Sequence, residues 1–279
     1  MPTLPANFDA LVRSLHPLLE GVEGYLSPRE VRLLALFGAC PTADGEALEI
    51  GSFKGRSTIV LAKATELAGD AALHAVDPLT SPSSTDPDLR GATSGRPEFE
   101  ANLTRAGVVS RVRFTQDFST NLAPRWTAPL RLLWIDGDHT LEGARADLEG
   151  FRAHLAEGAI VAFHDVLHPF DGPVRVFANL LEEPGWGAAG VCDSIGWAQR
   201  TSDPRAQAEH AATRRALARG LARITPLLES GRQPRGLARL QWRLLRALVP
   251  HGERRPEEIL TMLVDGRTHR ELRHSQPAR

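Results

Sequence analysis

The sequence predicts an α/β fold with a doubly wound, mostly parallel sheet of about seven strands, preceded by N-terminal helices and followed by a helical C-terminal appendage. Between residues 47 and 200, short apolar runs alternate with helical stretches, which is typical of a parallel sheet covered by helices on both faces. Apolar residues recur at helical spacing before residue 45, and alanine, arginine and leucine do so after residue 200. We therefore divide the chain into N-terminal helices (1–45), a central domain (46–200) and an appendage (201–279).

The strands are predicted from the apolar runs. The last two runs are separated by almost nothing and indicate a closing antiparallel hairpin. The predicted strands are 47–50, 72–76, 112–115, 130–135, 159–163, 188–192 and 194–198.

Helix starts can be read from local signals. The spacing of apolar residues predicts a first helix from Phe8 that ends near Gly21. Ser27 and Glu30 have the spacing of a capping box, which predicts that a second helix begins there. Later helices are expected to begin near Arg56, Arg96, Leu141 and Pro173.

Composition excludes several classes of protein. The net charge of −1 gives no global attraction to nucleic acid or anionic lipid. Cys40 and Cys192 form no metal-binding or disulfide pattern, so we expect a reduced, cytoplasmic setting. The N-terminus has no signal-peptide pattern, and no apolar run approaches the roughly 20 residues that span a bilayer. The polar stretch 79–95 predicts a long loop, either a lid over a site or a disordered insertion.

The turn after the first strand has the composition of a nucleotide cradle. Gly51 allows a positive φ and a close approach to a ligand, and Gly55 allows the next helix to pack closely. Phe53 stands where a dinucleotide fingerprint has its middle glycine, which disfavours pyrophosphate.

Acidic residues close the first two strands. Glu49 suits a cationic or amino-bearing ligand, Asp77 suits two ribose hydroxyls, and S-adenosylmethionine has both features. Its adenine is then expected near Asp117 and Ser119, which follow the third strand. The alternative is that the glycines serve only a tight turn and Asp77 only caps a loop. The predicted cofactor-binding residues are Glu49, Gly51, Ser52, Phe53, Gly55, Ser57, Asp77, Asp117, Ser119 and Asp136.

Four motifs in a fixed order carry a family resemblance. They are GYLSP (24–28), EIGSFKGRS (49–57), WIDGDH (134–139) and FHDV (163–166). On these motifs residues 24–200 resemble the class I S-adenosylmethionine-dependent methyltransferase superfamily, which is Rossmann-like, and within it the small-molecule O-methyltransferases related to macrocin O-methyltransferase. The resemblance implies the strand order 3-2-1-4-5-7-6, with the donor pocket at the carboxyl ends of the first and second strands.

Strands four and five end in acidic residues at the same sheet edge. Asp136 and Asp165 can therefore converge, and a divalent cation such as Mg²⁺ is the natural counter-ion. We predict Asp136 and Asp165 as metal ligands, with His164 as a third. Metal-dependent O-methyltransferases, which this site resembles, commonly have Asp-Asp or Asp-Asn after strand five. The histidine here suits Mn²⁺, Fe²⁺ or Zn²⁺ better than Mg²⁺, so the identity of the metal, and whether one binds, stays open.

The resemblance also implies a general base. His139 stands where the macrocin-type enzymes have a histidine in that role, and an imidazole can take a hydroxyl proton at neutral pH. His139 and Asp136 are the predicted catalytic residues. The alternatives are structural: Asp138 caps the helix that begins near Thr140, His139 bonds the backbone, and His164 with Asp165 fixes a loop.

The appendage is rich in arginine, with 16 arginines against 8 acidic residues after Arg200. Its leucine spacing predicts amphipathic helices that pack on the domain or on a second copy in a homo-oligomer. A nucleic-acid surface is the alternative, and a membrane-surface role around Trp242 is weaker because the apolar content there is modest.

The expected function is methyl transfer from S-adenosylmethionine to a hydroxyl of a small molecule, such as a sugar, polyol or secondary metabolite, with assistance from Mg²⁺ or Mn²⁺. No membrane partner is expected. Strand four lacks the Asn/Asp-Pro-Pro-aromatic signature of base-amino methylases, which disfavours nucleic acid as the acceptor. A nucleic-acid methyltransferase, a non-catalytic donor-binding protein and a nitrogen acceptor stay open.

Overall fold

The computed structural model describes residues 2–69, 73–80, 95–228 and 234–267. The first residue of the predicted second strand, Ala72, and most of the predicted loop 79–95 lie outside the described residues.

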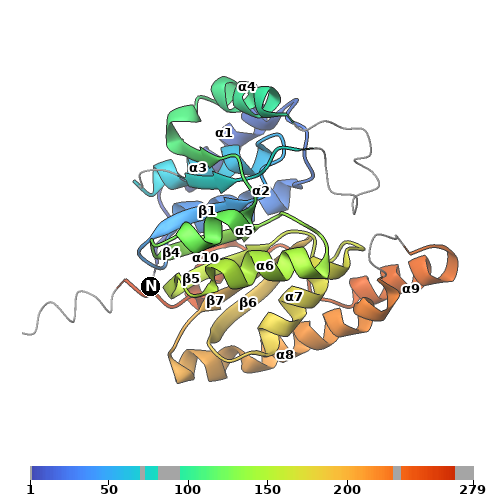
Figure 1. The fold of residues 1–279 in the computed structure, drawn as a ribbon. Coiled ribbons are helices and arrows are strands. Elements are labelled where there is room, and N and C mark those ends of the chain that lie inside the picture. The colour runs from blue at the N-terminus through green and yellow to red at the C-terminus, as the bar shows by residue number, and fades with distance from the viewer. Residues whose placement is uncertain (1, 70–72, 81–94, 229–233, 268–279) are drawn as a thin grey trace, which may run out of the picture.

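A seven-stranded sheet forms the centre of the molecule (Figure 1). Its order is β3-β2-β1-β4-β5-β7-β6, which confirms the predicted order. β7 runs antiparallel to both β5 and β6, so the closing hairpin is also confirmed. The strands are β1 (Glu46–Ile50), β2 (Leu73–Val76), β3 (Val112–Thr115), β4 (Leu130–Ile135), β5 (Leu155–Phe163), β6 (Trp186–Cys192) and β7 (Ile195–Arg200).

The strand ends are level at the carboxyl edge. Ile50 pairs with Val76 of β2 and with Ile135 of β4, and Ile135 pairs in turn with Phe163 of β5. Because these strands are parallel, the residue after each one emerges at the same edge. β5 begins at Leu155, four residues before its predicted start, since Glu157 and Gly158 interrupt the apolar pattern although the chain is already extended there.

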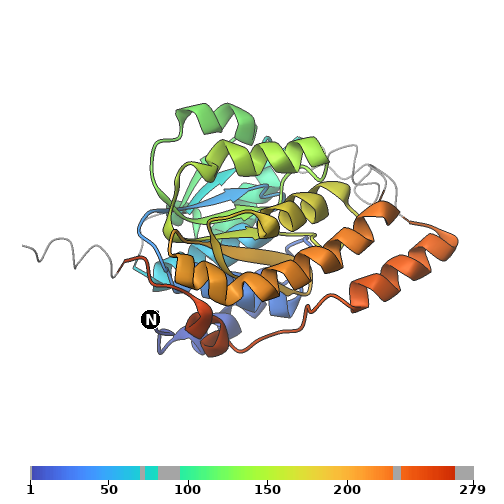
Figure 2. The ribbon, with the colours of Figure 1, turned by 90° about the horizontal axis from the view of Figure 1, so that it is seen from below.

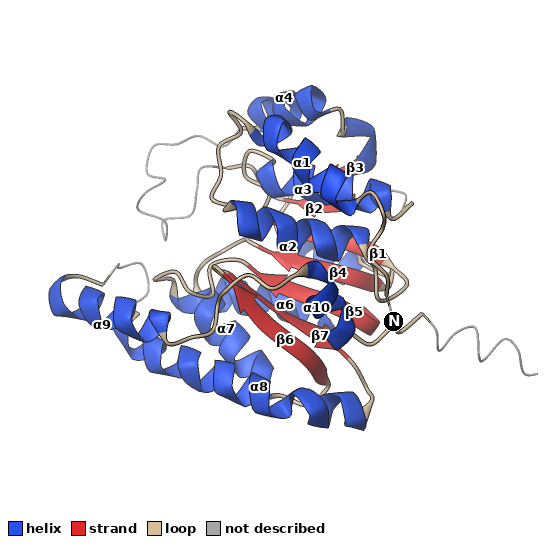
Figure 3. Cartoon of the chain, turned by 180° about the vertical axis from the view of Figure 1, so that it is seen from behind, coloured by secondary structure: helices blue, strands red, loops and turns tan. Residues whose placement is uncertain are grey.

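One face of the sheet is covered by the N-terminal helices. These are α1 (Phe8–Leu19), α2 (Pro28–Ala39) and α3 (Arg56–Leu67), and Figure 3 shows α2 and α10 (Pro256–Met262) over this face. The predicted capping box of α2 is present: the Ser27 hydroxyl accepts from Glu30 N, and the Glu30 carboxylate accepts from Ser27 N. Leu34 and Leu36 of α2 are buried in the core between this layer and the sheet.

The opposite face is covered by α6 (Leu141–Arg152), α7 (Asp171–Glu182) and α8 (Pro204–Ile224), as Figures 1 and 2 show. α8 packs along α7 and β6, and Leu217, Leu221 and Ile224 are buried in the same core as β4 and β5. The first helix of the predicted appendage is therefore part of the central packing. The division of the chain into three parts at residues 45 and 200 stays a prediction.

Shorter elements complete the chain. Val264 N donates to the Gln199 side chain and Gly266 N donates to Thr42 O, so the segment after α10 returns to the sheet.

None of the described helices is both long and apolar enough to cross a membrane. The remaining elements are α4 (Arg96–Ala106), α5 (Ser119–Leu122), α9 (Gly236–Ala247) and the 3-10 turns Val109–Arg111, Ala123–Arg125 and Thr225–Leu227.

The packing of α8 leads to a stability prediction. Leu221→Ala should lower the free energy of unfolding by about 2 to 5 kcal/mol, because it removes a fully buried side chain. Leu240→Ala, at an exposed position on α9, is the matched control and should change it by less than about 0.5 kcal/mol. Urea unfolding of both variants is the measurement. Equal, small effects would show that α8 does not contribute to the central core.

Candidate active site

A cavity of 470 Å³ opens at the carboxyl edge of the sheet. The turns after β1, β2, β4 and β5 contribute to its wall. Its lining residues are Glu23, Gly24, Tyr25, Leu26, Ile50, Gly51, Ser52, Phe53, Arg56, Ser57, Val76, Asp77, Pro78, Thr80, Phe118, Ser119, Asp136, Gly137, Asp138, His139, Asp147, His164, Asp165, His168, Pro169 and Phe170.

The turn after β1 is held tightly against the end of β4. Gly51 has φ +85°, and a Cβ placed on it would lie 2.1 Å from Asp136 O. Only glycine fits such a position. The predicted positive φ is present, but the close approach is to the neighbouring turn. The two turns that form the cavity wall are thus fixed relative to each other.

Gly55 plays a related part at the start of α3. It has φ +88°, and a Cβ there would lie 2.7 Å from Leu103 Cδ1. The absence of a side chain on Gly55 therefore allows α4 to pack against the start of α3. The sequence analysis had attributed this glycine to packing of the helix near the strand. Gly55 is not among the lining residues, while Ser57, two residues later, is.

Glu49 points into the protein. It is fully buried and is not a lining residue. Its carboxylate accepts from Ser52 Oγ at 3.0 Å and from Thr58 Oγ1 at 2.6 Å. Burial raises its pKa to about 7, against the lowering effect of the hydroxyl groups around it. The sequence analysis predicted that Glu49 contacts the ligand directly, but the side chain is directed away from the cavity. Glu49 instead supports the β1 turn through these hydrogen bonds.

Asp77 lines the cavity and also ties two turns together. Its Oδ2 accepts from the backbone N–H groups of Ser52 at 2.6 Å and Phe53 at 2.9 Å, and its Oδ1 accepts from Leu79 N at 2.6 Å. A carboxylate offers roughly four acceptor positions, so about one stays open. The sequence analysis had expected Asp77 to accept from two ribose hydroxyls, which requires two open acceptor positions.

The predicted adenine side is arranged differently from expectation. Asp117 is not a lining residue. Its carboxylate accepts hydrogen bonds from Phe118 N and from the side chains of Asn121 and Arg125. Ser119 does line the cavity, and its hydroxyl donates to Asp147.

Asp147 is a cavity residue that the sequence analysis missed. It lies on α6 and is buried, and burial raises its pKa to about 6. Its Oδ2 is buried with no hydrogen-bond partner among the described residues, and it packs so close to Gly137 that a Cβ there would lie 2.7 Å from that oxygen. Its position within a helix gave no reason to expect a site residue. The one sequence signal was a charged residue on the apolar face of α6.

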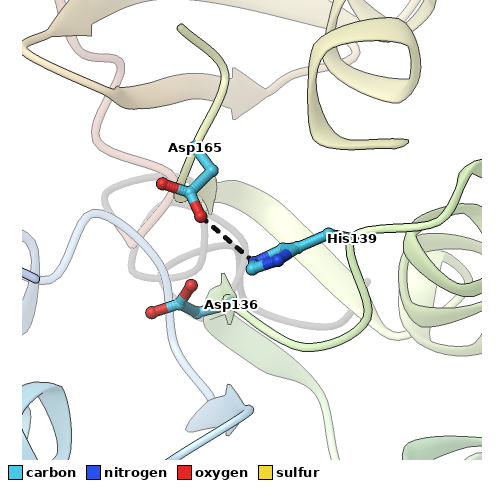
Figure 4. Close-up of side chains that lie close together, drawn as sticks. All are labelled: Asp136, His139 and Asp165. Atoms are coloured by element: carbon cyan, nitrogen blue, oxygen red, sulfur yellow. Dashed lines mark ion pairs between the residues drawn. The ribbon is translucent and has the colours of Figure 1, made fainter. Parts of the chain in front are cut away.

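Asp136, His139 and Asp165 come together at the ends of β4 and β5 (Figure 4). Each offers one ligand atom, and these atoms lie within 4.8 Å of one another. His139 Nε2 is 3.1 Å from Asp165 Oδ2, an ion-pair distance without hydrogen-bond alignment, and its ring stacks on Phe170. Asp136 and Asp165 converge as the sequence argument expected, and His139 joins them in this group. His164, the predicted third ligand, also lies next to both carboxylates.

Asp165 is surrounded by imidazoles. Its φ of +63° is a left-handed conformation that aspartate adopts more readily than most residues. Its Oδ1 lies 3.3 Å from His164 Nδ1 and also contacts His168 Nδ1. Burial alone would raise the pKa of Asp165, but His164 and the neighbouring histidines lower it well below its ordinary value. Asp165 is therefore a carboxylate anion.

His164 lies beneath the site. Its Nδ1 is 3.2 Å from Asp136 Oδ1, and its Nε2 is 3.8 Å from Glu30 Oε1. Burial alone would lower the pKa of His164, but Asp165 and Asp136 raise it well above 6.5. Glu30 Oε1 also accepts from Ser194 N and Oγ, so the capping box of α2 reaches the site. A cationic His164 compensates the charge of both aspartates and is poorly suited to bind a metal.

The electrostatic character of the cavity is acidic. Among the described lining residues, Arg56 is the single arginine or lysine, and its guanidinium already donates to Leu19 O and Val22 O. Asp77, Asp136 and Asp147 face the cavity from three different elements. Such a lining favours a cationic ligand.

Burial of Glu49 gives a testable pH dependence. Its pKa in the folded chain, about 7, lies above the ordinary 4.5, so the folded state binds the proton more tightly and loses stability as pH rises from about 4.5 to about 7. Glu49→Gln removes this titration. Its stability relative to the wild type should therefore rise by roughly 2 kcal/mol between pH 5 and pH 8. The measurement is urea unfolding across pH, with exposed Glu142→Gln as the control; a difference independent of pH would contradict the raised pKa.

Comparison with known proteins agrees with this geometry. A family model described as "Methyltransferase domain" (Methyltransf_24) matches residues 48–166, which contain both the β1 turn and the Asp136–His139–Asp165 group. The O-methyltransferase NovP has a similar structure, with a TM-score of 0.57 at 13% identity over 70% of this chain and 98% of that chain.

Two further structures show the same fold. The cofactor-bound Rv0187 protein from MTB has a TM-score of 0.51 at 20% identity, covering 73% of this chain and 100% of that chain. A protein from Corynebacterium glutamicum has a TM-score of 0.50 at 16% identity, covering 70% and 91%. The narrower macrocin-like group stays a prediction. The match to the methyltransferase-domain model covers residues 48–166, and the seven-stranded sheet has the fold of the class I S-adenosylmethionine-dependent methyltransferases.

Proposed function

We propose that this protein transfers a methyl group from S-adenosylmethionine to a hydroxyl group of a small molecule. The observation that carries the proposal is the acidic cavity in which the β1 turn and the Asp136–His139–Asp165 group share one wall. NovP, whose fold is similar, is described as an O-methyltransferase.

The donor side of the cavity fits an adenosyl sulfonium. Its acidic lining compensates a sulfonium charge, and the open acceptor of Asp77 suits a ribose hydroxyl. Asp147 Oδ2, which has no partner among the described residues, suits the amino group of adenine, and the exposed Phe118 ring offers a stacking surface. Ser52, Phe53, Ser57 and Ser119 line the remaining wall.

The acceptor side provides a base. When bound, S-adenosylmethionine supplies an electrophilic methyl group on a positively charged sulfur. His139 accepts the proton of the acceptor hydroxyl at the ring nitrogen that does not face Asp165, while Asp165 stabilises the imidazolium that forms. Stacking on Phe170 holds the ring in place. Burial alone would lower the pKa of His139, but Asp165 and Asp136 raise it.

A second candidate is metal-assisted transfer, and the grouping of Asp136, His139 and Asp165 favours it. Two carboxylates and one imidazole are a donor set that suits Mn²⁺, Fe²⁺ or Zn²⁺. A bound divalent cation would lower the pKa of the acceptor hydroxyl. His139 would then be a ligand, so the two candidates assign it different roles.

Donor binding is the first test. Calorimetry of the wild type with S-adenosylmethionine should show binding, and Asp77→Asn should weaken it at least tenfold, because a charged acceptor that holds the β1 turn is lost. Asp9→Asn, an exposed carboxylate on α1, is the matched control and should leave the affinity unchanged. If the wild type has no affinity for the donor or for S-adenosylhomocysteine, the proposal fails.

The role of His139 is the second test. S-adenosylhomocysteine formation should be measured with a panel of hydroxylated small molecules. His139→Asn should lower kcat by about 10² to 10⁴, whereas His154→Asn, at the opposite sheet edge, should not. Because the pKa of His139 is raised and the neutral ring is required, kcat should increase with pH through a value above 6.5.

Chelation separates the two candidates. If kcat survives removal of divalent ions, His139 acts as the base without a metal. If kcat is lost and returns with Mn²⁺ or Mg²⁺, the metal-assisted candidate holds. Full activity of His139→Asn would contradict both.

A further inference from the structure

Helix α9 exposes a row of leucines. Leu237, Leu240, Leu244 and Leu248 are 55 to 79% exposed, and their spacing of three, four and four residues places them along one side of the helix. Isolated exposed leucines are ordinary, but an aligned row marks an interaction surface.

A different side of α9 is packed on the protein. Trp242 is buried, and Val249 just after the helix is buried beside Gly220 of α8. Figures 1 and 2 show α9 beyond the end of the sheet, attached through α8. Within the described part of the chain, the leucine row is therefore left uncovered while the helix itself is anchored.

Arginines border the row on both sides. Each residue of a helix turns by about 100°, which places Arg239 and Arg243 next to one side of the leucine row on α9. On the other side, Arg219 and Arg223 of α8 line a 230 Å³ pocket together with Leu245 and Leu248. None of these four guanidinium groups has a hydrogen bond or ion pair to another described residue, and α9 contains no acidic residue.

The charge pattern decides between the occupants of this surface. In a symmetric dimer the same patch lies on both copies, so a second copy would place arginines opposite arginines. A nucleic acid would pair with the arginines but would leave the leucine row exposed to water. An anionic phospholipid surface matches both features, because leucines enter the acyl boundary while arginines bind phosphate groups.

We propose that α9 and the adjoining part of α8 dock on an anionic phospholipid surface. Leu237, Leu240, Leu244 and Leu248 form the inserted row, and Arg219, Arg223, Arg239 and Arg243 bind the head groups. The apolar content of the segment as a whole is modest, as the sequence showed, but the structure concentrates it on one uncovered side. This docking surface is independent of the methyl-transfer site.

The test is sedimentation of the full chain with vesicles. The wild type should bind vesicles of equimolar phosphatidylcholine and phosphatidylglycerol, more weakly at high salt, and should not bind phosphatidylcholine alone. Leu240→Ser/Leu244→Ser should weaken binding at least tenfold. Arg219→Gln/Arg223→Gln should weaken it roughly 25-fold, about fivefold for each arginine.

Controls keep the test specific. Arg113→Gln/Arg145→Gln removes two exposed arginines elsewhere and should leave vesicle binding unchanged. Circular dichroism should show the same folded signal for all variants, since every altered side chain is exposed. The proposal is overturned if the wild type does not bind the acidic vesicles, or if the α8 and α9 variants bind as tightly as the control. It is also overturned if inorganic phosphate binds but vesicles do not, or if the leucine variant only dissociates a dimer.

Discussion

The contact between the β1 turn and the end of β4 determines the rest of the site. Gly51 lies so close to Asp136 O that no side chain fits between them, and Asp77 holds the same turn through the N–H groups of Ser52 and Phe53. The β1 turn and the acidic residue at the end of β4 therefore form one tightly packed unit. Buried Glu49 supports this unit from below through Ser52 and Thr58, at the cost of a raised pKa.

Charge balance organises the other half of the site. Asp165 is an anion because three histidines surround it, and His164 is a cation because Asp136 and Asp165 face it. His164 thus places a positive charge beneath the two carboxylates. Glu30 links this charge to the start of α2, which makes a helix cap part of the electrostatics of the cavity.

Sequence periodicity predicted the strands and the sheet edge at which Asp77, Asp136 and Asp165 lie, because strand register leaves little freedom there, and the family resemblance implied the strand order. It did not predict where side chains in turns and on helices point. Glu49 turns inward, Asp117 bonds its own loop, and Asp147 enters the cavity from α6, since these directions depend on packing that a linear pattern does not contain. The place of His139 beside Asp136 and Asp165 has the same origin. The uncovered leucines of α9 likewise depend on which side of the helix packs.

The central claim is that one cavity holds the donor beside the Asp136–His139–Asp165 group. A crystal structure of the protein with S-adenosylhomocysteine tests it most directly. We expect the ribose at Asp77, the adenine amino group at Asp147 and the sulfur facing Asp136. An adenosyl group bound outside this cavity, or a base far from Asp147 with the sulfur directed away from Asp136, would contradict the account.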